Sequence, residues 1–117
     1  MKLSGEAVLL RVFVSETDKV DGKCLYEQIV LRARELNIAG ATVLRGIMGY
    51  GATSRMHTAK ILRLSEDLPL VIEIVDTREK LAPLLPFLDE AVATGMVTTE
   101  TVHVVHYRPG RQAEAAE

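Results

Sequence analysis

The stretch AVLLRVFVS at positions 7–15 is apolar on both faces of the strand that its alternation predicts. One face carries Val8, Leu10, Val12 and Val14, and the other carries Ala7, Leu9, Arg11 and Phe13. A strand with this pattern belongs in a sheet that is covered on both sides. Any fold of this chain therefore has to supply cover for both faces of the sheet.

The apolar spacing alternates between strand and helix periods along the rest of the chain. The first half is expected to contain a polar stretch at Glu16–Lys23 with a turn at Asp21 and Gly22, a helix at Lys23–Asn37 ended by Gly40, and a strand at Ala41–Ile47. A strand at 70–76, introduced by Pro69, and a helix capped by Thr77 and reaching about Ala93 are expected next. A loop at Thr94–Thr99 and a strand at Glu100–Tyr107 complete the order. Pro83 and Pro86 predict a kink after the first turn of the second helix.

This order predicts an α+β fold of the ferredoxin-like βαββαβ type, a four-stranded antiparallel sheet with two helices on one face. We expect a single domain over residues 1–108, with a long loop at about 48–60 and a flexible tail at 109–117. The second face of the sheet then has no cover from the chain itself, which favours assembly through that face. Arg11, Arg45 and Glu73 interrupt the apolar positions, either as paired charges at the interface or as solvated ones.

Composition narrows the classes of function. The 117 residues carry a net charge of −2 and a sequence pI near 5.9, which disfavours nucleic acid as a partner. No apolar run approaches the ~20 residues that span a bilayer, and no secretory signal is expected. Cys24 is the only cysteine, so no intrachain disulfide is possible, and we expect a cytoplasmic protein.

The most informative segment is RGIMGYGATSRMHTAKILR at 45–63. It holds three of the eight glycines, four of the fourteen Lys and Arg residues, and no acid. Glycines let backbone donors approach an anion closely while cations neutralise it, which indicates a phosphate-bearing ligand. The plainer interpretation is that the glycines permit turns and the cations keep a long hairpin soluble. The length of the connection and the glycines at its base favour a binding role.

Signatures of common enzymes are missing from the sequence. It contains no Walker loop, G-x-G-x-x-G, HExxH, CxxC or GxSxG motif, so we expect neither catalytic residues nor a metal site. Cys24 is more typical of a small core residue than of a reactive thiol. Two alternatives stay open: a divalent-metal-binding trimer of the cation-tolerance type, and a small ferredoxin-like dimeric enzyme in which His57 and a carboxylate do acid–base work.

Three features, RGIMGYG, the Met56–His57 pair and the strand LPLVIEIVD, resemble the signature of domain-of-unknown-function family 190, the P-II-like signalling proteins. The likeness spans about residues 6–108. More distantly, the order of elements and the run from Pro69 through IEIV to TGMV resemble the nitrogen-regulatory P-II proteins. Those are ferredoxin-like homotrimers that bind adenine nucleotides between subunits and present a mobile T-loop to a target.

The resemblance implies a set of site residues. The base of the T-loop beside the nucleotide corresponds to Arg45, Gly46, Ile47, Met48 and Gly49, with Arg55 and His57 adding charge. The loop that closes over the phosphates corresponds to Thr94, Gly95, Met96, Val97 and Thr98. The partner loop corresponds to Tyr50, Gly51, Arg55, Met56 and Lys60 within 48–60.

One departure from the P-II pattern bears on the ligand. P-II proteins have a lysine in the phosphate loop, whereas Met96, Val97 and Thr98 follow Gly95 here. The resemblance with this departure implies that AMP or ADP suits the site better than ATP, and no other cofactor is expected. It also implies a homotrimer without catalytic turnover. The target of the loop would be a membrane transporter, by the genomic association of this family with fluoride-channel-type proteins, or another protein.

Overall fold

The structure is a computed structural model that describes residues 3–51, 57–58 and 67–110. The elements are β1 (Gly5–Ser15), β2 (Lys19–Val20), β3 (Lys23–Cys24), α1 (Leu25–Glu35), β4 (Ala41–Arg45), β5 (Met48–Gly49), β6 (His57–Thr58), β7 (Pro69–Asp76), α2 (Arg78–Leu81), the 3-10 turn η2 (Ala82–Leu84), α3 (Leu85–Ala91) and β8 (Met96–Val104).

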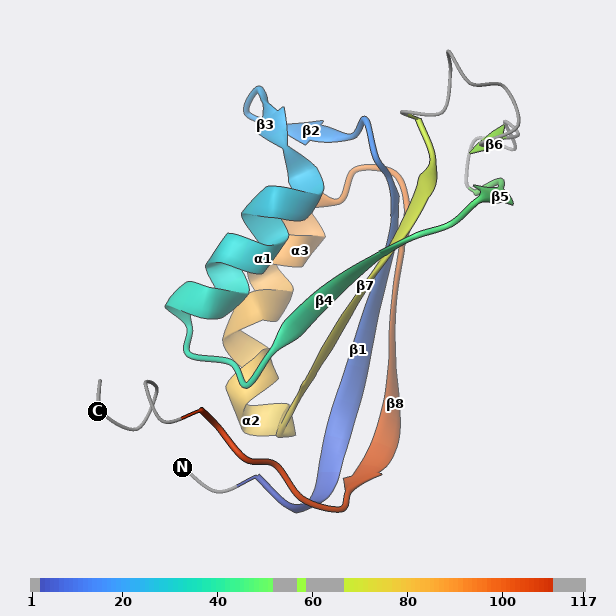
Figure 1. The fold of residues 1–117 in the computed structure, drawn as a ribbon. Coiled ribbons are helices and arrows are strands. Elements are labelled where there is room, and N and C mark those ends of the chain that lie inside the picture. The colour runs from blue at the N-terminus through green and yellow to red at the C-terminus, as the bar shows by residue number, and fades with distance from the viewer. Residues whose placement is uncertain (1–2, 52–56, 59–66, 111–117) are drawn as a thin grey trace.

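Four long strands form the central sheet in the order β4-β7-β1-β8, and every neighbouring pair is antiparallel (Figure 1). The first strand therefore lies between the third and the fourth long strands of the chain. With the helices between them, these strands give the predicted ferredoxin-like α+β fold. Two short ribbons, β2–β3 and β5–β6, are added to it.

Both long helical segments cover the same face of the sheet (Figure 1). The α1 residues Leu25, Ile29 and Ala33 recur at helical spacing and are buried against the alternate positions of β1 and β7. The core consists of Val8, Leu10, Val12, Val14, Leu25, Ile29, Ala33, Ile38, Leu70, Ile72, Ile74, Leu81, Leu84, Leu88 and Ala91. The predicted inner face of the first strand is thus confirmed.

The second helical segment is broken where its prolines predict. Thr77 caps its start, because the Thr77 hydroxyl accepts a hydrogen bond from the Lys80 backbone N–H at 3.2 Å. The single turn α2 passes into the 3-10 turn that contains Pro83, and α3 then begins with Pro86 in its first turn. Proline is tolerated there because the first N–H groups of a helix have no intrahelical partner.

A buried carboxylate ties two connections together. The Asp76 side chain has no exposed surface. Its Oδ2 accepts a hydrogen bond from the Ala39 N–H at 2.8 Å, and its Oδ1 accepts one from the Thr77 N–H at 2.7 Å. Asp76 therefore fixes the turn before β4 against the start of α2.

The other face of the sheet carries alternate apolar residues that no described element covers. β1 contributes Leu9 and Phe13, and β7 contributes Val71 and Val75 from positions whose neighbours face the core. In Figure 1 the helices lie on one side of the sheet only. The predicted uncovered face is thus present only in part: Phe13 is exposed, whereas Ala7 is buried. Val75 lines a hollow together with His106 and Tyr107, which follow β8.

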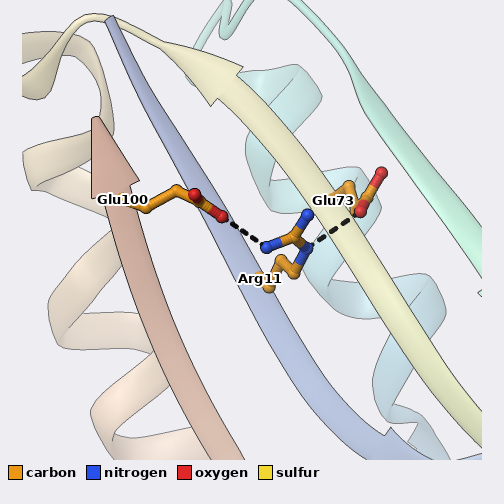
Figure 2. A network of polar contacts seen from close by, with 3 residues as sticks. All are labelled: Arg11, Glu73 and Glu100. Carbon is orange, nitrogen blue, oxygen red and sulfur yellow. Dashed lines mark hydrogen bonds and ion pairs between the residues drawn. The ribbon is translucent and has the colours of Figure 1, made fainter. Parts of the chain in front are cut away.

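A charged network interrupts this open face at its centre. Arg11 Nε lies 2.9 Å from Glu73 Oε2, and Arg11 Nη1 lies 2.6 Å from Glu100 Oε1 (Figure 2). The hydrogen bond to Glu73, and to a smaller extent the one to Glu100, raises the pKa of the Arg11 guanidinium. The predicted paired charges are therefore satisfied within one chain, across β7, β1 and β8.

Some predicted boundaries were wrong. α1 ends at Glu35, and the chain turns at Asn37, which has φ 59°, rather than at Gly40. The polar stretch after β1 was predicted without strands but contains the β2–β3 hairpin. The turn predicted at Asp21 and Gly22 is confirmed, with φ 51° and 77°. The predicted loop at Thr94–Thr99 is shorter, because β8 begins at Met96.

Candidate functional site

Arg45 is the last residue of β4, and its guanidinium pairs with the carboxylate of Glu16, which directly follows β1. The Arg45 side chain is 60% exposed, whereas the Glu16 side chain is only 13% exposed. Most of the Arg45 side chain is thus exposed, whereas its acidic partner is largely buried. A cation in this position can bind an anion from solution while it is held from below.

The two glycines after Arg45 allow the chain to pass close to Pro69. The Gly46 N–H donates a hydrogen bond of 2.7 Å to the Pro69 carbonyl. A Cβ at Gly46 would lie 3.0 Å from Pro69 Cγ, and one at Gly49 would lie 3.3 Å from the same atom. Between these two glycines, Ile47 and Met48 are 79% and 57% exposed. Two predicted site residues, Ile47 and Met48, therefore form an exposed aliphatic surface on a tightly packed turn.

The long connection is closed at its base by backbone pairing. Met48 pairs with Thr58, and Gly49 pairs with His57, in the β5–β6 ribbon. This ribbon brings the backbones of three predicted site residues together. Tyr50 is exposed beside the ribbon, as is Gly51. Of the remaining predicted loop residues, Arg55, Met56 and Lys60 lie outside the described residues.

Gly95 begins a second group of predicted residues at the other edge of the sheet. Its φ of 152° is a conformation that other residues rarely adopt, and a Cβ there would lie 2.5 Å from the Phe13 carbonyl oxygen. Thr94 is exposed immediately before it. Met96, Val97 and Thr98 belong to β8 and pair with Phe13, Val12 and Arg11. The expected five-residue phosphate loop is therefore a short turn followed by a strand.

A hollow of about 220 Å³ lies beside Gly95, between α3 and the start of β8. It is lined by Leu85, Leu88, Asp89, Val92, Gly95, Met96 and Val97. Three of these residues were predicted as site residues. The contribution of α3 to this hollow was not predicted, although Leu85 and Leu88 belong to the apolar repeat of that helix.

The two groups lie at the same end of the sheet but on opposite edges. Arg45 pairs with Leu70, and Leu70 pairs with Val14, whose neighbour Phe13 pairs with Met96. Arg45 and Gly95 thus lie at the two ends of one row across four strands. Three strand spacings correspond to roughly 14 Å. A single chain therefore does not bring the two groups into direct contact.

The described residues contain no candidate metal site. Within residues 3–51, 57–58 and 67–110, no group of three or more His, Cys, Asp and Glu side chains is arranged to hold a metal ion. No helix in the same part of the chain combines the length and apolarity that crossing a bilayer requires.

The fold, an antiparallel sheet in the order β4-β7-β1-β8 with both helical segments on one face, is that of the PII-like proteins. CPII, a nitrogen regulatory PII-like protein from Thiomonas intermedia K12 solved with ADP and bicarbonate, has a TM-score of 0.67 and 18% identity, covering 88% of this chain and 95% of its own. The divalent ion tolerance protein CutA1 from Ehrlichia chaffeensis has a TM-score of 0.53 and 11% identity, covering 93% and 89%. At these identities both likenesses show the fold alone.

The chain belongs to the DUF190 family (Uncharacterized ACR, COG1993), whose model matches residues 7–104. A UPF0166 protein of Aquifex aeolicus (strain VF5) is 40% identical over 100 residues, which cover 84% of this chain and 92% of the relative. The resemblance seen in the sequence is confirmed at the level of the family.

Proposed function

We propose that this protein is a nucleotide-responsive regulator without catalytic turnover, which binds AMP or ADP in clefts between copies of the chain. The position of the two predicted groups at one end of the sheet, on opposite edges, carries the proposal. In a closed ring, the β4 edge of one copy approaches the β8 edge of the next. Arg45 of one copy and Gly95 of its neighbour then line a single cleft.

The open face of the sheet supports a ring of copies. Its apolar side chains come from β1 and β7, and the charged residue Arg11 at its centre is already paired with Glu73 and Glu100. Burying this face therefore does not strand an unpaired guanidinium, which is the main cost of burying a charge. As in the P-II proteins that the sequence resembles, the ring is proposed to have three copies.

The charges favour a ligand with few phosphates. Among the described residues of the connection and its base, Arg45 is the cation, and Met96, Val97 and Thr98 supply no cation at the opposite edge. The structural neighbour CPII binds ADP, AMP and bicarbonate, which supports the same class of ligand. The connection at 48–60 is proposed to present the response to a protein partner, a membrane transporter or another target.

Light scattering tests the assembly. The expected mass is about three times the 12.9 kDa of one chain, because three sheets have to bury their open faces to complete three clefts. A monomer at micromolar concentration would contradict the proposed cleft. A dimer would favour the alternative of a small ferredoxin-like enzyme.

Isothermal titration calorimetry with AMP, ADP, ATP and cyclic AMP tests the ligand. We expect saturable binding by the unaltered protein, and a loss of about tenfold in affinity for AMP in Arg45→Ala, because a charge-assisted hydrogen bond to phosphate is lost. Arg34→Ala, at an exposed position on α1, is the matched control and should bind AMP normally.

The remaining outcomes separate the other classes of function. Silence with all four nucleotides, together with a response to a divalent cation, would favour the cation-tolerance alternative, whose fold this chain shares. Hydrolysis of a nucleotide that persists through rigorous purification would favour an enzyme.

A further inference from the structure

Glu16 is an acid held close beneath the cation of the candidate site. It lies immediately after β1, and its carboxylate reaches the Arg45 guanidinium at the end of β4. These strands are not neighbours in the sheet, since β7 lies between them. The ion pair therefore bridges the end of β7 at the end of the sheet where the candidate site lies.

The backbone around Glu16 is fixed on both sides. The Glu16 N–H donates a hydrogen bond of 2.8 Å to the Leu68 carbonyl, and the Ser15 N–H donates one of 2.9 Å to Asp18 Oδ2. The hydroxyls of Ser15 and Thr17 both donate to Asp67. These contacts hold the backbone at Glu16 against the segment that leads into β7.

The side chain of Glu16 is buried as well as anchored. It is 13% exposed, and its Oε1 is sealed from solvent with no hydrogen-bond partner among the described residues. Among the residues that the structure describes, the partner of this carboxylate is the Arg45 guanidinium. This largely buried carboxylate therefore lies close to any anion that binds the exposed part of Arg45.

We infer that Glu16 determines the charge selectivity of the site: it makes the site prefer a nucleotide monophosphate over the triphosphate. This inference rests on the proposed function, and it assigns the selectivity to a residue outside the glycine-rich segment. A phosphate on Arg45 is attracted by the guanidinium and repelled by the carboxylate beneath it. Each additional phosphate adds repulsion from Glu16, whereas Arg45 supplies only one positive charge.

The experiment measures a ratio of affinities rather than a single affinity. Dissociation constants for adenosine, AMP and ATP are determined by calorimetry for the unaltered protein and for Glu16→Gln, which keeps the size of the side chain and removes its charge. We expect AMP to bind about tenfold more tightly to the variant and ATP to gain more than AMP, as repulsion at short range in a partly buried site implies. Adenosine, which carries no phosphate, should change by less than about twofold.

Two further variants make the result specific to the charge at this position. Glu6→Gln removes an exposed acid at the opposite end of β1 and should leave all three affinities unchanged. Glu16→Asp keeps the charge and should keep the preference for AMP over ATP. If Glu16→Gln shows no cooperative thermal transition, Glu16→Met removes the same charge with a side chain of similar length, and the ratio is read from that variant.

Every outcome bears on the inference. An unchanged ratio of ATP to AMP affinity in the charge-removing variant overturns it, while the proposed function stands because the unaltered protein still binds. Weaker binding of AMP in Glu16→Gln also overturns it, because Glu16 would then serve to position Arg45. Absence of binding by every variant and by the unaltered protein overturns the proposed function itself, and the inference with it.

Discussion

Replacement of Gly95 by alanine should destabilise the protein by about 3 kcal/mol or more, through backbone strain and a clash that no rotamer relieves. The residue has φ 152°, and the new Cβ would lie 2.5 Å from the Phe13 carbonyl oxygen and 3.1 Å from Val92 Cγ1. The atom in closest contact belongs to the backbone of β1, so relief requires β1 and β8 to separate. Their pairing runs from Gly5 to Phe13 and would be lost from this end.

Thermal unfolding followed by circular dichroism measures this effect. We expect a fall in Tm on the order of 10 °C at a fixed protein concentration. Gly40→Ala is the matched control, because no atom lies within 4 Å of a Cβ built there and the residue has no positive φ. A Tm for Gly95→Ala within about 2 °C of the control would show that the turn before β8 has another conformation.

Replacement of Asp76 by alanine is the second substitution with a large expected effect. The change leaves the N–H groups of Ala39 and Thr77 without acceptors in a site that has no exposed surface. Hydrogen bonds to a charged acceptor contribute about 1.5–3 kcal/mol each, so a loss of about 3 kcal/mol in the free energy of unfolding is a conservative expectation.

Urea denaturation tests this prediction, with the shift in midpoint read at an unchanged slope. Asp76→Asn keeps one carbonyl oxygen as an acceptor and should retain part of the lost stability. Asp89→Ala, an exposed acid on α3, should unfold like the unaltered protein. Equal stability of Asp76→Ala and Asp89→Ala would contradict the role of the buried carboxylate.

Most of the fold was predictable because apolar spacing determines which residues face the core. The alternation in β1 and the helical repeat of Leu25, Ile29 and Ala33 lead directly to the observed layers. The start of β8 was not predictable in this way. Met96, Val97 and Thr98 carry no alternation of their own, and they become a strand because β1 extends far enough to pair with them.

The candidate site was predictable only in part, for a physical reason. Glycines and cations stand out in a sequence, so the resemblance and the composition together indicated Arg45, Gly46 and Gly95. Glu16 did not stand out, because it lies in a polar stretch and meets Arg45 only through the folding of β1 and β4 onto β7. The role of Asp76 was not predictable either, since nothing in the local sequence shows that its carboxylate accepts hydrogen bonds from the N–H groups of both Ala39 and Thr77.

The two ends of the long connection between β4 and β7 are held by main-chain hydrogen bonds that do not involve its side chains. The Gly46 N–H is bonded to the Pro69 carbonyl, and the Glu16 N–H is bonded to the Leu68 carbonyl, so both points where the connection meets the sheet are fixed by main-chain atoms. Main-chain hydrogen bonds do not depend on the identity of the side chains in the connection. Exchange of that stretch for an unrelated sequence therefore leaves the scaffold intact, and it is a route by which one scaffold acquires a different binding partner over evolution.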